Sequence, residues 1–509
     1  MATIDVTEAL ATRQADAPTY LLSRWLFVRL LGVVYLVAFL SLVTQVTGLV
    51  GEHGLLPAGA YLARAHAIYG SSAYRLFPTL CWLGASDGML EGLCWAGVVL
   101  SLLLLAGVAQ APVLLLLWVC YLSLSVAGQT FLWFQWDALL LETGLLALLF
   151  APTQVVPSLT SERPPLALAR WLVWGLLFRL MVLSGATKLA SADPTWRRLT
   201  ALDYHFWTQP LPPWPAWYAQ WLPEWMHRGM TLAILVIELG VPWLILAPPR
   251  WRYARRMRHS ACGALIVGQL GIALTGNYGF FNLLAIVLCV PLLDDAFVRR
   301  VLPLPLAAGA PEPRWKIYAV RGLGSVLALL ALLAFVREIA QTAPGVRRPL
   351  ENPLLDAVAP LRSVNGYGLF RVMTTERPEI VLEGSDDTLH WREYGFRWKP
   401  GDVTQRPAFM APHMPRLDWQ MWFAGLDPVG AQPWLLPLLR HVLEGTPEVL
   451  GLLGENPFPA RPPRYVRLVY YRYRFAEPSE RARSGAWWDR EPIGYLTRPL
   501  TVADFAPPR

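Results

Sequence analysis

LFVRLLGVVYLVAFLSLVTQVTGLV, residues 26–50, is an apolar run long enough to cross a lipid bilayer as a helix. A transmembrane helix needs roughly 20 mostly apolar residues. Similar runs follow at 89–108, 111–128, 138–152, 166–187, 229–247, 259–275, 280–293 and 317–340. The pattern predicts a polytopic α-helical membrane protein with about nine spans, with eight or ten as alternatives because two of the runs are short.

The composition agrees with a chain that is largely surrounded by lipid. Only 16% of the 509 residues are charged and the mean hydropathy is +0.37, whereas soluble domains carry about 25% charged residues. The net charge of +8 lies largely in short loops between the apolar runs. This is where membrane proteins place their arginines, so the charge does not indicate nucleic-acid binding.

Basic residues near the ends of the spans predict the orientation. The loop PPRWRYARRMR at 248–258 carries five arginines, and further basic residues lie between 299 and 321. Such loops face the cytoplasm. Counting alternate crossings from these loops places residues 1–25 in the cytoplasm. The same count places the loops 51–88 and 188–228, and the whole segment 343–509, on the outer side.

Residues 343–509 change in character, because the long apolar runs give way to prolines, charges and alternating patterns. The stretch 467–475 alternates between apolar and charged side chains, which is typical of a half-buried strand. We expect two more strands at 379–383 and 391–398, and one or two short helices within 433–453. The segment is therefore predicted to be a soluble extracytoplasmic domain, mostly β and sandwich-like.

Ionisable residues within the apolar runs are candidate functional groups, because placing a charge at the centre of a span costs about 2.5–3.5 kcal/mol. The candidates are Asp137, Glu142, Arg179, Glu238 and Lys188. One interpretation pairs Arg179 with Glu142 or Glu238 to lock the bundle. The alternative makes Lys188 a proton acceptor or anion site, since a lysine withdrawn from water loses part of its preference for the charged form.

Aromatic side chains form a second group of candidates. The loop 207–225 contains Trp207, Trp214, Trp217 and Trp221, and the segment 418–423 contains Trp419, Trp422 and Phe423. Trp and Tyr favour the membrane interface, so an interfacial belt is the simpler interpretation for the loop, whereas core packing is the simpler interpretation for the segment 418–423. Alternatively, both segments bind client proteins, because exposed aromatic patches mark interaction sites.

Other sites receive little support from the sequence. Asp203 and His205 could bind a metal, but no further histidine is close in sequence and a structural hydrogen bond is the simpler interpretation. The five cysteines have no C-x-x-C spacing, and none lies in 290–509. We expect no metal, no cofactor and no disulfide framework in the soluble domain, and no nucleophile–base set can be assembled.

Several long strings resemble the lipase maturation factor family over nearly the whole chain. They are FQWDALLLETG at 134–144, the stretch 179–212, GNYGFFNLL at 276–284, the stretch 365–387, PHMPRLDWQMWFA at 412–424, NPFP at 456–459 and PPRYVRLVYYRYRF at 462–475. The resemblance implies a role in helping secreted lipases fold, with the soluble domain on the outer or luminal side. It also implies membrane lipids and a secreted or envelope client, such as a lipase, as partners.

A shorter stretch is similar to the region around the catalytic lysine of vitamin K-dependent carboxylases. It comprises SGATKL at 184–189 with Asp193 and Trp196, although Thr187 replaces one lysine of that pattern. The two resemblances give two hypotheses. The first is a membrane-anchored folding or maturation factor in a bacterial inner membrane, or in the endoplasmic reticulum membrane of a eukaryote. The second is a carboxylase-like membrane enzyme that uses Lys188 as a base on a lipid or quinone-like substrate.

Overall fold

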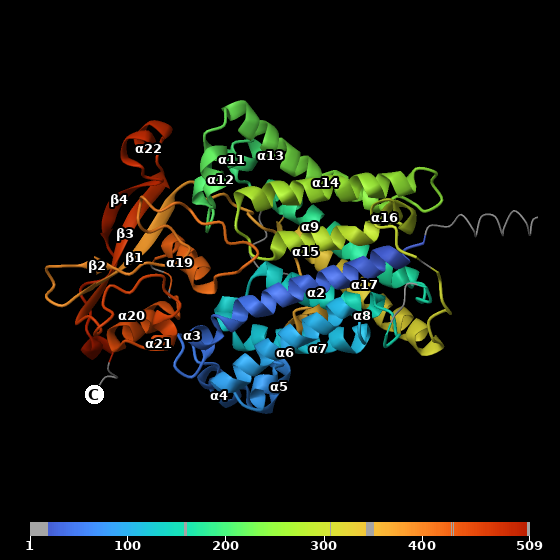
Figure 1. Cartoon of the computed structure of the whole chain (residues 1–509), viewed down its shortest axis with the longest axis horizontal. Coiled ribbons are helices and arrows are strands. Elements are labelled where there is room, and N and C mark those ends of the chain that lie inside the picture. The colour runs from blue at the N-terminus through green and yellow to red at the C-terminus, as the bar shows by residue number, and fades with distance from the viewer. Residues whose placement is uncertain are drawn as a thin grey trace, which may run out of the picture.

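A computed structural model describes residues 19–156, 160–305, 307–342, 351–428, 430 and 432–505. A bundle of long helices forms one half of the molecule and a smaller part, built around a sheet, covers one end of it (Figure 1). The first eighteen residues, and residues 343–350 at the expected start of the soluble domain, lie outside the described ranges.

Each of the nine predicted spans contains a helix. In chain order they are α2 Leu21–Val43, α6 Asp87–Ala106, α7 Gln110–Ala127, α8 Gln135–Phe150, α9 Ala167–Ala190, α13 Glu224–Leu239, α14 Ala254–Thr275, α15 Phe281–Cys289 and α17 Arg314–Thr342. They run back and forth between the two ends of the bundle (Figure 1). We call these the domain-facing end and the arginine-rich end, the latter formed by residues 19–24, 151–156, 160–166, 248–258, 293–305 and 307–316.

Not every one of these helices meets the length and hydropathy of a full span. Six helices in the described ranges do so, counting α13 with the 3-10 turn that follows it, and the bent pair of α15 with α16, Asp295–Val301, would make seven. Helix α8 has only 16 residues, most of them buried among its neighbours. Because it is surrounded by protein, its length need not match the thickness of the lipid core. Helix α14 begins with an arginine-rich turn. By length and hydropathy, the described residues therefore contain six or seven spans, fewer than the predicted nine.

Short helices occupy both loops at the domain-facing end. The loop after α2 contains α3 Val46–Val50, α4 Ala58–Tyr69 and α5 Ala73–Leu76. The loop after α9 contains α10 Pro194–Arg197, α11 Ala201–Thr208 and α12 Trp214–Gln220. The two groups lie on opposite sides of the bundle, close to the sheet-containing part (Figure 1).

The C-terminal part contains one antiparallel sheet, and the described residues do not form the predicted sandwich. Its strands are β1 Arg377–Ser385, β2 Arg392–Glu393, β3 Tyr465–Phe475 and β4 Trp488–Tyr495, in the order β2-β1-β3-β4. Strands β1 and β3 match the predicted strands, whereas most of 391–398 is not strand. Helices rather than a second sheet supply the rest of the core.

Those helices are α19 Arg416–Leu426, α20 Leu435–Glu444 and α21 Pro447–Leu450. Helix α20 ends at Gly445, whose φ of 74° is the left-handed conformation that glycine adopts without strain, and Pro447 begins α21. The segment 433–453 thus contains two short helices, the larger of the two predicted numbers. Helix α19 lies between the bundle and the sheet (Figure 1), so the aromatic segment 418–423 is placed at the junction of the two parts.

Candidate functional site

Buried ion pairs at the domain-facing end join the bundle to the C-terminal part. Asp137, in the first turn of α8, accepts hydrogen bonds from both terminal nitrogens of Arg416 at 2.6 and 2.8 Å. The hydroxyl of Tyr121 donates to the same carboxylate at 2.6 Å. All three side chains are buried. The two carboxylate oxygens of Asp137 thus bind two nitrogens of the Arg416 guanidinium, which is the strong bidentate geometry. This contact fixes α19 against α8.

One helical turn deeper, the Glu142 carboxylate contacts Arg179 through one oxygen and the chain after α17 through the other. The second oxygen accepts hydrogen bonds from the backbone N–H and the amide of Asn365, both at 3.1 Å, and from the Tyr367 hydroxyl at 2.7 Å. Arg179 also donates to the Asn365 carbonyl at 3.0 Å. Of the two predicted partners for Arg179, the structure places Glu142 in contact, and Glu238 lies elsewhere.

Glu238 instead pairs with Lys188. The ammonium lies 2.6 and 2.7 Å from the two carboxylate oxygens and 5.3 Å from the centre of the Trp196 ring. The lysine is only 4% exposed. Lys188 and Glu238 therefore form a buried ion pair that joins α9 to α13.

A fourth cluster connects the sheet to the loop after α9. The Arg377 guanidinium on β1 lies 2.7 Å from Glu379 and donates to the carbonyls of Trp207 and Pro210 at 3.0 and 2.7 Å. Lys399 lies 3.0 Å from the other oxygen of Glu379. These residues, and Arg416, are absent from the predicted candidates. Charged residues inside the otherwise apolar segments 377–383 and 412–424 were the feature of the sequence that could have identified Arg377, Glu379 and Arg416.

The aromatic candidates separate into buried and exposed groups. Trp217, Trp419 and Trp422 are buried, and Trp217 donates from its indole N–H to the Ala476 carbonyl at 2.9 Å. These three side chains pack inside the protein, which agrees with the core-packing interpretation of Trp419 and Trp422 and leaves little of their surface for a client. Trp207 is half-buried, while Trp214, Trp221 and Phe423 are partly exposed.

Asp203 and His205, the possible metal ligands, each contact another side chain. Asp203 contacts Nδ1 of His227 at 2.9 Å, and His205 contacts the Tyr278 hydroxyl at 3.0 Å. Burial, reinforced by the charge of Lys188, lowers the pKa of His205 to about 4, so this imidazole is neutral at physiological pH. Groups of three or more His, Cys, Asp or Glu that could hold a metal are not found among the described residues.

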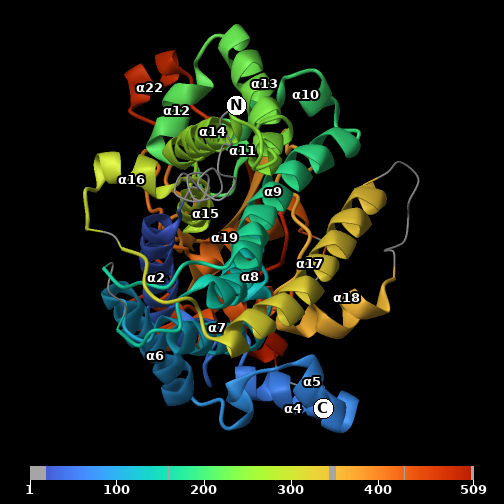
Figure 2. The same cartoon turned by 90° about the vertical axis from the view of Figure 1, so that its right-hand side faces the viewer.

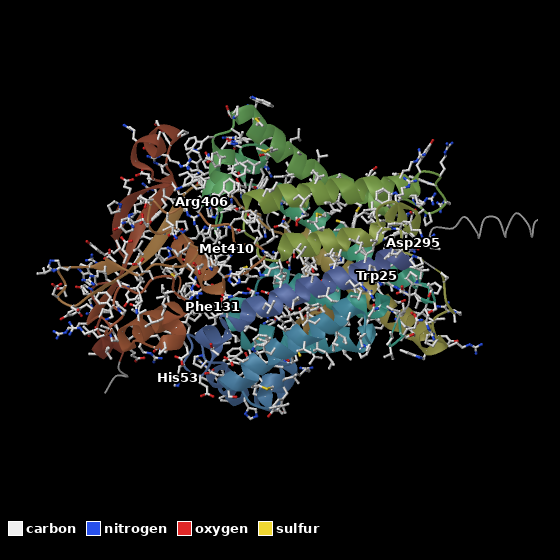
Figure 3. The ribbon with its side chains drawn as sticks, in the orientation of Figure 1. Trp25, His53, Phe131, Asp295, Arg406 and Met410 are labelled. Atoms are coloured by element: carbon white, nitrogen blue, oxygen red, sulfur yellow. The ribbon has the colours of Figure 1, made fainter. Side chains whose placement is uncertain are left out.

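The ion pairs and buried aromatic side chains lie mainly where the bundle meets the C-terminal part. Figure 3 shows Phe131 and Met410 at the junction between the bundle and the C-terminal part, whereas Trp25 and Asp295 lie at the arginine-rich end. A cavity of about 270 Å³ opens in the bundle, lined by Glu142 and Arg179 but not by Lys188. With Lys188 paired and away from that cavity, the carboxylase-like hypothesis has no structural support.

Comparison with known proteins covers both parts of the chain. Residues 22–300 match a family described as the lipase maturation factor transmembrane domain, and residues 363–497 match the lipase maturation factor C-terminal domain. The chain is 36% identical to lipase maturation factor 2 of Rattus norvegicus, covering 94% of this chain and 83% of the relative. It is 34% identical to lipase maturation factor 1 of Bos taurus, covering 96% and 91%. No solved structure gives a significant match.

Proposed function

The chain belongs to the lipase maturation factor family, and we propose that it assists the folding of a secreted client, such as a lipase, at the domain-facing surface of the membrane. The chain is an integral membrane maturation factor. The identity of the client, the face at which it binds and the compartment are the proposed elements. We propose the outer side of a bacterial inner membrane, or the lumen of the endoplasmic reticulum in a eukaryote.

The orientation rests on arginine placement and on the arrangement of the helices. The loop 248–258, which carries five arginines, lies at the end of the bundle opposite the sheet (Figure 1), and such loops remain on the cytoplasmic side. The C-terminal part therefore faces the compartment in which secreted proteins fold. A client in that compartment would meet this surface first.

The single observation that carries the client-binding proposal is an exposed aromatic surface beside the sheet. We define it as Trp214, Tyr218 and Trp221, all partly exposed on or next to α12. The neighbouring Trp217 is buried against Trp487 of the C-terminal part, with ring centres 5.8 Å apart. The exposed rings are thus attached to the sheet-containing part. Partly folded clients expose apolar surface, which such rings can cover.

Strand addition is a less suitable mode of binding. The outer strand β4 carries Asp489, Arg490, Glu491 and Pro492. Proline lacks the N–H needed to extend a sheet, and charges discourage another chain from pairing with an edge. The proposed contact therefore uses side chains rather than the free edge of the sheet.

The experiment compares two sets of exposed side chains at the same end of the bundle. One variant carries Trp214→Ser, Tyr218→Ser and Trp221→Ser, and the matched control carries Ile68→Ser, Tyr74→Ser and Leu83→Ser in the loop after α2, all exposed. Each is expressed with a secreted lipase in cells lacking the endogenous chain. We expect the first variant to reduce lipase activity per lipase molecule several-fold while the control does not.

Point variants are preferable to removal of the C-terminal part. Deletion of residues 343–509 would leave the buried Asp137 and Glu142 without their partners Arg416, Asn365 and Tyr367, so the bundle itself would be destabilised. If both triple variants lower lipase activity equally, the aromatic rings serve the membrane interface. If neither does, clients bind elsewhere and the aromatic surface is not the site.

A further inference from the structure

The cavity in the bundle lies between α9 and α17. It has a volume of about 270 Å³. Its lining includes Trp171, Gly175, Phe178, Ala328, Leu332 and Phe335. Helix α17 stands at the edge of the bundle next to α9 (Figure 2), and most of its surface is not covered by protein. The cavity is therefore an apolar hollow at the depth of the lipid.

Small residues create the space. No atom lies within 4 Å of the position that a Cβ would take on Gly175, and Ala328 and Ala331 face it from α17. A buried apolar cavity of about 150 Å³ is already large enough to hold a benzene-sized ligand. The volume between α9 and α17 therefore accommodates a longer apolar group, and in a membrane the available group is a lipid acyl chain.

The polar groups at the domain-facing end of the cavity do not need a ligand. Glu142 and Arg179 hold one another, and the remaining carboxylate oxygen is bonded to Asn365 and Tyr367. Ser363 donates to the Leu361 carbonyl at 2.8 Å and accepts from the Trp118 indole at 2.9 Å. A lipid headgroup has no free partner there, so only the end of a chain fits this side.

The opposite end of the same helix face carries an unpaired cation. Arg321, Ser325, Ala328, Leu332 and Phe335 follow one another at helical spacings of three and four, so they form one stripe along α17. Arg321 is exposed and has no ion pair or hydrogen bond with any residue in the described ranges. The stripe changes from charged to apolar over about 21 Å, which is more than half of a hydrocarbon core of about 30 Å.

The surroundings of Arg321 mark the membrane interface. Tyr318 and Trp315, about one and two turns nearer the arginine-rich end, are both exposed. Exposed Trp and Tyr gather at the level of the lipid headgroups. Side chains on a helix lean toward its N-terminus, which for α17 is the arginine-rich end, so the Arg321 guanidinium reaches back to this level.

We propose that the groove between α9 and α17 holds one acyl chain of an anionic phospholipid from the leaflet at the arginine-rich end, with its phosphate on Arg321. The apolar hollow selects the chain, and the unpaired cation at its entrance selects the headgroup. The bound lipid would fill the space beside the Glu142–Arg179 pair and exclude water from it. This inference is independent of the client-binding proposal.

Native mass spectrometry of the delipidated full-length chain tests the site with two probes. These are phosphatidylglycerol and phosphatidylcholine with the same acyl chains. We expect the parent to prefer phosphatidylglycerol. Arg321→Gln should weaken phosphatidylglycerol binding about fivefold, the effect of roughly one arginine–lipid contact, and leave phosphatidylcholine binding unchanged.

Variants that fill the groove should act differently. Gly175→Leu and Ala328→Leu enter it from opposite helices and should reduce the binding of both lipids. Gly322→Leu is the control, because Gly322 lies on α17 with open space around it but outside the lining. The proposal is overturned if Arg321→Gln keeps the phosphatidylglycerol preference, if both filling variants bind as the parent does, or if Gly322→Leu loses as much binding as they do.

Discussion

The two ends of the helical bundle both contain buried ion pairs, but the pairs at each end connect different parts of the protein. At the arginine-rich end, Arg24 on α2 lies 3.0 Å from Glu162, and both partners belong to the bundle and its loops. At the domain-facing end, Asp137 on α8 pairs with Arg416 on α19 of the C-terminal part. The first pair closes the bundle on itself, whereas the second makes the C-terminal part a structural component of the bundle.

This difference changes how the C-terminal part is understood. A domain attached only by its linker could be removed without affecting the membrane helices. Here, Asp137 and Glu142 are satisfied by residues of the C-terminal part, and a buried carboxylate that loses its partner destabilises the fold. Loss of the C-terminal part should therefore destabilise the membrane helices that contact it.

The largest expected effect comes from Arg416→Met. It leaves the Asp137 carboxylate buried without its cation, which should cost about 3–5 kcal/mol of stability. Thermal unfolding in detergent measures the loss, and hydrogen exchange should rise in α19. Replacing Asp137 by Leu in the same chain should recover part of the stability, because it removes the unpaired charge. If the single variant is as stable as the parent, the pair does not join the two parts.

Arg24→Met makes the matching change at the arginine-rich end. Glu162 then loses its buried partner, and a loss of stability of similar size, about 3–5 kcal/mol, is expected. The two variants should differ in the part of the chain where hydrogen exchange increases. Hydrogen exchange should rise at the start of α2 while α19 stays protected. Equal loss of protection in α19 for both variants would show that the two ends are not distinct.

Features of the fold that depend on neighbouring residues could be predicted from the sequence, whereas contacts between residues far apart in the chain could not. Helices appear from runs of apolar residues and β3 from strict alternation, because both patterns are local. The pairing of Asp137 with Arg416 joins residues 279 apart in sequence, and a single sequence contains no local signal for it. The predicted sandwich was wrong for the same reason, since 418–423 and 433–453 pack as helices against one sheet.

The candidate residues divide in the same way. Residue type alone identified Glu142, Arg179, Lys188 and Glu238 as polar groups that require partners. It left two partners open for Arg179, and only the packing of α8, α9 and α13 decides between them. The burial of Trp419 and Trp422 could not be predicted from the sequence either, because aromatic residues occur both in cores and at interfaces.

Acid should weaken the domain-facing end through His205. Its pKa is about 4 in the folded chain against about 6.5 unfolded, so the unfolded state binds the proton more readily. The stability that the neutral imidazole contributes is present above pH 6.5 and is lost as the pH falls toward 4, up to about 3 kcal/mol. Unfolding at pH 7 and pH 4.5 measures it. His205→Gln should show a smaller loss between the two values; an equal loss would contradict the shift.

The smallest effect is expected from an exposed ion pair. Arg472 on β3 lies 3.5 Å from Glu491, and both side chains are largely exposed. Such pairs contribute little because water screens them and ordering the side chains costs entropy. Arg472→Met should change stability by no more than about 0.5 kcal/mol. A loss as large as that of Arg416→Met would mean that burial does not explain the difference between these arginines.

Labelling of single cysteines in intact cells tests most directly whether the C-terminal part faces the compartment of secreted clients. All five native cysteines are buried, so the background is low. Leu389→Cys in the C-terminal part and Val301→Cys at the arginine-rich end are matched probes, because the native side chains are 79% and 80% exposed. A membrane-impermeant maleimide should label Leu389→Cys in intact cells, or in sealed microsomes only after permeabilisation if the chain resides in the endoplasmic reticulum, with Val301→Cys showing the opposite behaviour. The reverse pattern would place the sheet in the cytoplasm and contradict a role in the maturation of secreted proteins.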